Sequence, residues 1–235
     1  LLLIQQLRGN ANFWSVLQPS LKPKLGAVDA LLSQVDQSSK YVCPPGTPSE
    51  VRAKFEEFWD AVEAFRILFE RRDAWETAFN VSLPGILSPG EQLAQPGVRD
   101  RLVWVGGDAT LEVSFALDWT NNKFVLIPVR DYIEALRQAA GRGENDLIIS
   151  IAELLCLVAV AAVSGSTWQG SLVLYVSDNG NVVSWINKRG ARNRMARHLL
   201  QILQLIELRG GFRVVSAYFR TFHNLTADLG SRAEE

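Results

Sequence analysis

The stretch from residue 150 to residue 163 most limits what this chain can fold into, because it is apolar at almost every position. It reads Ser-Ile-Ala-Glu-Leu-Leu-Cys-Leu-Val-Ala-Val-Ala-Ala-Val. A helix that is apolar all round belongs inside a protein core rather than on its surface. With Glu153 inside it, the stretch is too short to cross a bilayer, which needs about 20 apolar residues. We therefore predict a buried central helix and expect no membrane partner.

Five segments around this helix show the alternation or β-branching that is typical of strands. They are residues 101–107, 113–119, 123–129, 171–177 and 212–219. A second helix is predicted over residues 192–209, because apolar residues recur on one face before Gly210 and Gly211 stop the pattern. Residues 99–235 are therefore expected to form an α/β domain, in the α+β sense of a mixed sheet covered by helices.

Residues 1–98 read as a helical segment. Residues 1–34 form two helical stretches broken around Pro19 and Pro23, and a turn-rich break follows at residues 41–50. Beyond that break, apolar side chains alternate in steps of four and three, which predicts a long helix that packs on a neighbour. These side chains are Val51, Phe55, Phe58, Val62, Phe65 and Phe69. Residues 81–97 are rich in Pro and Gly and predict a linker.

Four acidic residues lie at positions where a carboxylate would be energetically unfavourable unless a cation lay beside it. Asp108 closes an apolar stretch, Glu153 lies in the apolar helix, Asp178 ends a strand-like segment, and Asp228 follows the last strand. Carboxylates held together raise one another's pKa, and a hard divalent cation removes that conflict. The set predicts a site for two Mg²⁺ ions, with Mn²⁺ as a substitute, and a pair of ions suits in-line displacement at phosphorus.

Each acid taken alone also has a structural interpretation. Asp108 can be a turn residue after two glycines, and Glu153 can complete an S-x-x-E capping box with Ser150. Asp178 begins Asp-Asn-Gly, which is typical of a hairpin turn, and Asp228 can be a solvated acid near a helix start. Only the joint pattern of the four acids favours a metal site.

The segments that carry these acids resemble the ribonuclease H domains of retroelement reverse transcriptases over about residues 101–232. Gly-Gly-Asp-Ala-Thr at Asp108 is similar to the family's first motif, and Glu153 followed by Leu-Leu is similar to its second. Asp178 to Lys188, Asp-Asn-Gly-Asn-Val-Val-Ser-Trp-Ile-Asn-Lys, matches the third closely. Residues 224–232, Asn-Leu-Thr-Ala-Asp-Leu-Gly-Ser-Arg, match the fourth. Two departures are Gly107, where the family usually has a hydroxyl residue, and the extra glycine before Ser-Arg.

This resemblance implies a ribonuclease H-like fold and metal-assisted hydrolysis of the RNA strand in RNA–DNA hybrids, leaving 3′-hydroxyl and 5′-phosphate ends. Asp108 and Asp178 would share ions, while Glu153 and Asp228 would each complete one. His223 would help protonation or product release. Residues 1–98 resemble the thumb or connection segment of such enzymes, so the implied partners are the hybrid and an upstream polymerase domain or another element-encoded subunit.

Basic residues concentrate just after the third motif, and they predict contact with a phosphate backbone. The predicted nucleic-acid-binding residues are Asn179, Lys188, Arg189, Arg192, Arg194 and Arg197. A solvated helix face is the alternative. The net charge of −1 means that binding must rely on this local patch and on metal ions.

Composition indicates the cellular compartment, and two alternative functions are compatible with the sequence. The 235 residues are 48% apolar, enough for a real core, and two cysteines are too few for a disulfide framework. We therefore expect an intracellular protein, in the cytoplasm or the nucleus. One alternative is a domesticated, catalytically silent scaffold or interaction subunit with the same fold. The other is a DNA-cutting nuclease of the resolvase or transposase kind.

Overall fold

The computed structural model describes residues 1–17, 22–33, 49–70, 89–94, 97, 99–132, 134–135, 137, 145–220 and 225–232. The chain divides into two compact units, Leu1–Ile86 and Leu87–Glu235. The predicted boundary, between residues 98 and 99, falls later in the chain. Short helix α5 (Pro89–Leu93) accounts for the difference, because its Leu93 packs against the sheet of the second unit.

The first unit contains three described helices, as the sequence predicted. They are α1 (Leu2–Leu17), α2 (Lys22–Leu32) and α3 (Ser49–Glu70). Val28 and Leu31 of α2 are buried with Phe58 of α3, and Phe65 of α3 is buried with Ala11 and Leu25. Phe55 and Val62 pack against the same residues, so the described part of the predicted stripe faces the neighbouring helices. The side chains of Val51 and Phe69 lie outside the described part of the chain.

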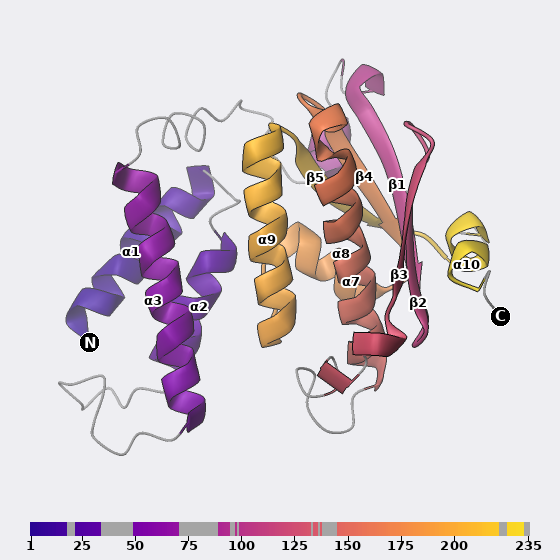
Figure 1. Ribbon diagram of the computed structural model, residues 1–235. Helices are drawn as coiled ribbons and strands as arrows, with labels where there is room; N and C mark the ends of the chain where they lie inside the picture. The colour runs from indigo at the N-terminus through magenta and orange to yellow at the C-terminus, as the bar shows by residue number, and fades with distance from the viewer. Residues whose placement is uncertain are drawn as a thin grey trace. The chain divides into compact units, whose positions relative to one another are not determined.

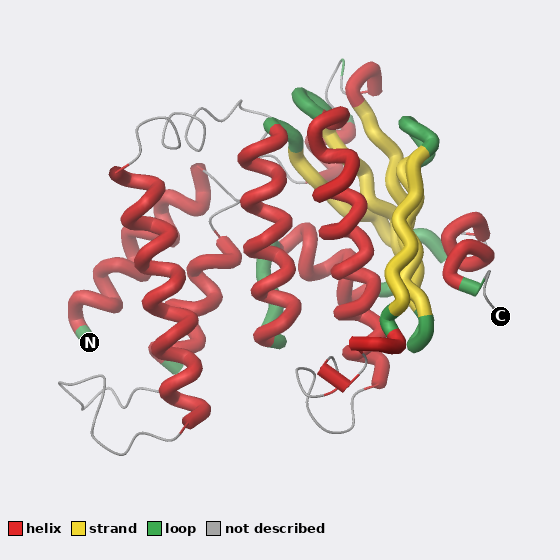
Figure 2. Tube along the Cα trace, in the orientation of Figure 1, coloured by secondary structure: helices red, strands yellow, loops and turns green. Residues whose placement is uncertain are grey.

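The second unit is built on one mixed sheet of five strands (Figures 1 and 2). The strands are β1 (Leu102–Ala109), β2 (Val113–Asp118), β3 (Lys123–Pro128), β4 (Leu172–Ser177) and β5 (Arg213–Tyr218), in the spatial order β3-β2-β1-β4-β5. β1, β2 and β3 pair antiparallel, whereas β1, β4 and β5 run parallel. All five predicted strands are confirmed, and so is the α/β class.

Helices cover both faces of this sheet (Figure 1). On one face lie α7 (Asn145–Ser164), α8 (Gly180–Lys188) and α9 (Arg194–Gly210). The short helix α10 (Leu225–Ser231) packs on β1 and β2 from the other face, where Gly230 lies against the ring of Phe115. The amphipathic helix predicted over residues 192–209 is confirmed as α9, and Gly211 ends it in the left-handed conformation with a φ of 65°.

Helix α7 is the centre of the core, as predicted. Ile151, Leu154, Leu157 and Val160 are completely buried among residues of the sheet and of α9. The prediction that this helix is too short to cross a bilayer was wrong: Leu147–Trp168, 22 residues, is long and apolar enough by length and composition. Its apolar window is 67% buried inside the protein, so burial and not length shows its role as a core helix.

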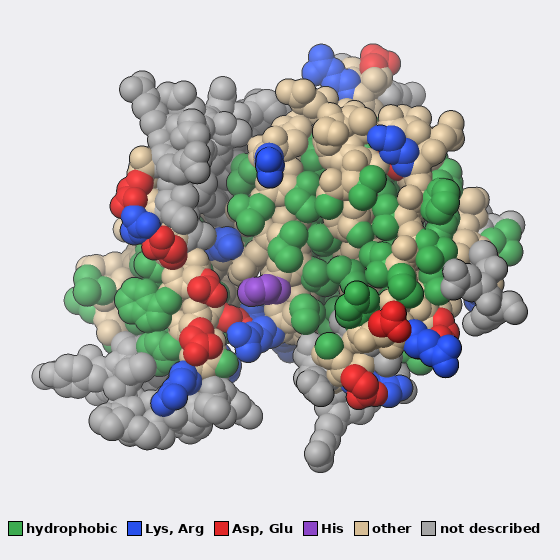
Figure 3. Space-filling model, in the orientation of Figure 1, with side chains coloured by type: hydrophobic (Ala, Val, Ile, Leu, Met, Phe, Trp, Pro, Cys, Tyr) green, Lys and Arg blue, Asp and Glu red, His purple; other side chains and the backbone are tan. Residues whose placement is uncertain are grey.

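The outer surface formed by α7 and α9 is itself mostly apolar. Figure 3 shows hydrophobic side chains across this face of the second unit, with Lys and Arg side chains at its margins. Val163, Ile202 and Leu205 are exposed residues of these two helices.

One buried ion pair joins three elements of the second unit. The Arg189 guanidinium donates to both carboxylate oxygens of Glu207, at 2.6 and 2.7 Å, and to the carbonyl of Val214 at 2.6 Å. Glu207 in turn accepts the backbone N–H of Val214 at 2.7 Å. Both side chains are nearly inaccessible, at 3% and 5% exposure. Arg189 is therefore corrected from a predicted phosphate contact to an internal brace between α8, α9 and β5.

We predict that Arg189→Ala destabilises the protein by about 3–5 kcal/mol, because it leaves the Glu207 carboxylate buried without its partner. Urea denaturation followed by circular dichroism measures this loss. The matched control is Arg192→Ala, an exposed arginine three residues further on, which should change stability by less than about 0.5 kcal/mol. Equal effects of the two substitutions would contradict the assignment of Arg189 as a brace.

Candidate metal site

Strand register brings Asp108 and Asp178 together. β1 and β4 are parallel neighbours, with Gly106 opposite Val176. Asp108 and Asp178 each follow two residues later, so they reach the same level at the carboxyl ends of these strands. Because side chains alternate between the two faces of a strand, residues spaced by two point the same way. The two carboxylates therefore project side by side from adjacent strands.

Helix α7 brings Glu153 to the same place from the covered face of the sheet. Its carboxylate is only 2% exposed and is held by two donors. Ser177 Oγ donates to Oε2 at 2.7 Å, and Asn179 Nδ2 donates to Oε1 at 3.0 Å. One oxygen each of Asp108, Glu153 and Asp178 lies within 4.8 Å of the others. Three convergent carboxylates with no nitrogen or sulfur donor among them fit a hard cation such as Mg²⁺.

The single-residue interpretations of these three acids are wrong. Asp108 lies inside β1 and not in a turn. Ser150 lies inside α7, so it cannot cap the start of that helix with Glu153. Asp178 does not begin a hairpin, because Asn179 caps the helix α8 by accepting the N–H groups of Asn181 and Val182.

Gly106 and Gly107 make room for two aromatic side chains beside the site. A Cβ on Gly107 would lie 2.2 Å from Tyr175 Oη, and a Cβ on Gly106 would lie 2.2 Å from the Trp119 ring. Tyr175 Oη donates to the backbone carbonyl of Glu153 at 3.3 Å. The tyrosine hydroxyl thus occupies the space that a side chain at position 107 would need.

Asp228 lies near the other acids but outside their cluster. It stands on α10, which is joined to β1 by a hydrogen bond from Ser231 Oγ to Asp108 Oδ2 at 2.7 Å. Its own carboxylate pairs with the Arg232 guanidinium at 2.8 Å. The predicted fourth acid therefore lies next to Asp108 on α10, but its carboxylate pairs with the half-exposed Arg232. His223 lies outside the described residues.

Burial dominates the electrostatics of the cluster. It raises the pKa of Glu153 to about 8, against the hydrogen bonds from Ser177 and Asn179, which lower it, and the charges of Asp108 and Asp178 raise it further. Burial also raises the pKa of Asp108, although the hydrogen bond from Ser231 lowers it. Without a cation, the site therefore keeps a proton that a bound divalent ion would replace.

The predicted nucleic-acid-binding residues fall into two groups. Lys188, Arg192 and Arg194 are exposed. Arg197, like Arg189, is buried, and its guanidinium donates to the carbonyl of Arg192. Asn179 is half-buried, and both ends of its amide are used inside the protein, to cap α8 and to hold Glu153. The positive surface is thus smaller than predicted.

Three site residues escaped prediction as functional groups: Ser177, Tyr175 and Ser231. Ser177 and Ser231 directly contact the carboxylates of Glu153 and Asp108, and both are nearly buried. Each stands inside or beside a motif that carries an acid, so position next to an acid was the available signal. The role of Tyr175 had no such signal, because it depends on a close approach to Gly107 on the neighbouring strand.

In comparisons with known proteins, no family model, no curated protein and no solved structure matched this chain.

We predict that the metal-free protein loses stability as the pH rises from about 5 to about 8. The folded-state pKa of Glu153, about 8, lies above its ordinary value of 4.5, so over this range the folded chain holds a proton that the unfolded chain has released. The free energy of unfolding should fall by up to about 1.4 kcal/mol per pH unit. Urea denaturation at several pH values in EDTA measures this slope.

Glu153→Gln should flatten that slope and should make the metal-free chain more stable than the wild type at pH 8. The matched control, Glu112→Gln, changes an exposed glutamate on the loop between β1 and β2 and should keep the wild-type slope. A wild-type slope in Glu153→Gln would mean that the Glu153 carboxyl is not the group that titrates.

Proposed function

We propose that the second unit is a metal-dependent endonuclease of the ribonuclease H type, which hydrolyses the RNA strand of RNA–DNA hybrids as part of a retroelement reverse transcriptase. The observation that carries this proposal is the convergence of Asp108, Glu153 and Asp178, with one oxygen of each within 4.8 Å of the others. Carboxylates in this arrangement suit the binding of Mg²⁺, which takes its remaining ligands from water and substrate phosphates.

The local structure around each acid supports the resemblance that the motifs suggested. The first acid lies in a strand, the second on the core helix, and the third precedes an Asn that caps a helix ending at Lys188. The fourth acid lies on a helix that packs beside the first. A mixed five-stranded sheet with helices on both faces is consistent with a ribonuclease H-like fold.

Catalysis depends on what these residues hold in place. Asp108 and Asp178 project from adjacent parallel strands, so the rigid sheet sets their separation. Ser177 and Asn179 orient the two oxygens of Glu153 toward them. Bound Mg²⁺ would supply an activated water and would neutralise the charge that develops at phosphorus. Burial raises the pKa of Glu153 to about 8, so a divalent cation bound here below that pH would take the place of a proton.

We expect the chain to cleave a labelled RNA–DNA hybrid in Mg²⁺, and Asp178→Asn to lower the rate by about 100-fold or more, since it removes a ligand worth several kcal/mol in the transition state. Gel electrophoresis of the products measures cleavage. The matched control is Asp131→Asn, an exposed aspartate outside the cluster, which should retain full activity.

Duplex DNA and duplex RNA are the comparison substrates in the same assay. Cleavage of duplex DNA in preference to the hybrid would favour a DNA-cutting nuclease of the resolvase kind. If the folded chain cleaves none of the three substrates and binds no Mg²⁺, the proposal of an enzyme is wrong and a scaffold or interaction subunit is favoured.

A second ion at Asp228 has to compete with Arg232. The guanidinium of Arg232 lies 2.8 Å from the Asp228 carboxylate and is half-exposed, so it is a replaceable positive charge. We expect Arg232→Gln to tighten the weaker of two Mn²⁺ binding steps by up to about fivefold, the scale of a partly exposed ion pair. Calorimetric titration without nucleic acid measures both steps, and Arg101→Gln serves as a control on an exposed arginine of the same unit. Weaker Mn²⁺ binding in Arg232→Gln would contradict this competition.

A further inference from the structure

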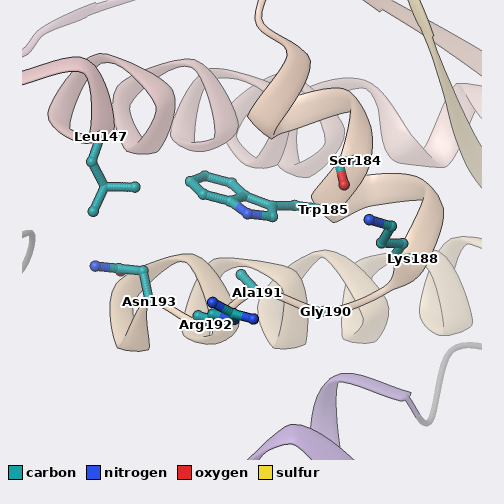
Figure 4. A pocket seen from close by; sticks show the side chains of 8 residues that line it. All are labelled: Leu147, Ser184, Trp185, Lys188, Gly190, Ala191, Arg192 and Asn193. Carbon is teal, nitrogen blue, oxygen red and sulfur yellow. The ribbon is translucent and has the colours of Figure 1, made fainter.

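A pocket of about 760 Å³ lies where α7, α8 and the start of α9 meet (Figure 4). Its volume is in the range of small-molecule binding sites. The lining residues all belong to the second unit: Leu147, Ser184, Trp185, Lys188, Gly190, Ala191, Arg192 and Asn193. None of them belongs to the acid cluster, so the pocket is a separate site.

An aromatic ring and two cations dominate the lining. Figure 4 shows the Trp185 indole across the middle of the pocket, with Leu147 beyond one end and Lys188 beyond the other. Trp185 is partly buried and packs against the core of the unit, which limits the freedom of its ring. Lys188 and Arg192 are exposed, and neither side chain forms an ion pair with a described residue. The described lining contains no Asp or Glu.

These features select the chemistry of the ligand. A fixed indole offers a flat apolar surface for a planar ring, and base-on-aromatic stacking is tolerant of sequence. Lys188 and Arg192 offer positive charge for a phosphate, and the N-terminal end of α9, capped by Asn193, adds to it. A nucleotide combines a flat base with a phosphate and so fits both features.

We propose that this pocket binds one unpaired nucleotide of a nucleic-acid strand, with the base against Trp185 and the phosphate between Lys188 and Arg192. The position suits a strand that also crosses the acid cluster. Leu147 lies less than two turns before Glu153 on α7, about 9 Å along the helix axis. Trp185 stands on α8, which begins two residues after Asp178. This proposal rests on the proposed function in one respect: the nucleotide belongs to the strand that is bound at the acid cluster.

The test is fluorescence anisotropy with a labelled single-stranded DNA of eight nucleotides in EDTA, where no cleavage occurs. Trp185→Leu should weaken binding by at least about fivefold, as loss of one stacked base predicts. The same substitution should leave the affinity for an oligonucleotide of abasic residues unchanged, because that strand has no base to stack. The control Trp104→Leu removes an exposed tryptophan from β1 and should change neither affinity.

The phosphate half of the pocket is tested with the double variant Lys188→Gln/Arg192→Gln. It should weaken the binding of intact and abasic strands alike and should reduce the dependence of affinity on salt. Arg209→Gln, at the far end of α9, is the matched control. These exposed substitutions do not threaten the fold, so they decide the question even if Trp185→Leu fails to fold. Wild-type affinity in the double variant, or an equal loss for intact and abasic strands in Trp185→Leu, would overturn the proposal.

A free mononucleotide has the same chemistry as one nucleotide of a strand, so AMP is added as a competitor. We expect AMP to displace the oligonucleotide only at concentrations far above the dissociation constant of the strand. Displacement by AMP at concentrations comparable to the dissociation constant of the strand would overturn the proposal that the bound nucleotide belongs to a strand. All of these binding measurements omit divalent cations. They therefore test the pocket separately from the proposed nuclease activity, which requires Mg²⁺.

Discussion

The burial of one carboxyl group inside an apolar helix is the constraint on which the rest of the second unit depends. Glu153 lies in the middle of α7, among fully buried aliphatic residues such as Ile151, Leu154 and Leu157. A carboxylate in such surroundings needs hydrogen-bond donors. Ser177 and Asn179 supply them. Because Ser177 ends β4 and Asn179 begins α8, holding Glu153 also fixes the end of a strand and the start of a helix.

The parallel pairing of β1 and β4 turns this constraint into a site. Because the two strands are in register, Asp108 and Asp178 lie at the same level at the end of the sheet. Glu153 reaches the same place from α7. The close approach of Tyr175 to Gly107 and the bond from Ser231 to Asp108 tie the neighbouring strand and α10 to the same point. The sheet and the two helices thus hold the acids close together, and the charge of Asp178 raises the pKa of both Asp108 and Glu153.

Positive charge is divided between structure and surface in the same unit. Arg189 and Arg197 are turned inward, where Arg189 holds α8, α9 and β5 together through Glu207. Lys188 and Arg192 remain outside, at a pocket that also contains a fixed tryptophan. A chain with a net charge of −1 thus keeps a small positive site near its acids. Local placement, and not overall charge, decides where an anionic strand can bind.

The elements of the second unit were predictable because their signals are local. Alternation, β-branching and a helical apolar period are set by neighbouring residues, so the five strands, α7 and α9 were found from the sequence by itself. The same holds for the acids as candidates, since each stands at the edge of an apolar segment. What each charged group does could not be predicted in this way. Arg189 and Lys188 are adjacent in a basic run, yet a left-handed turn at Arg189 sends one side chain into the core and leaves the other in solvent. Ser150 and Glu153 match a capping box, yet the helix begins five residues earlier. Sequence by itself determined which acidic and basic residues were candidates for a site. Tertiary structure decided which of them meet, because strand register and burial bring together residues far apart along the chain.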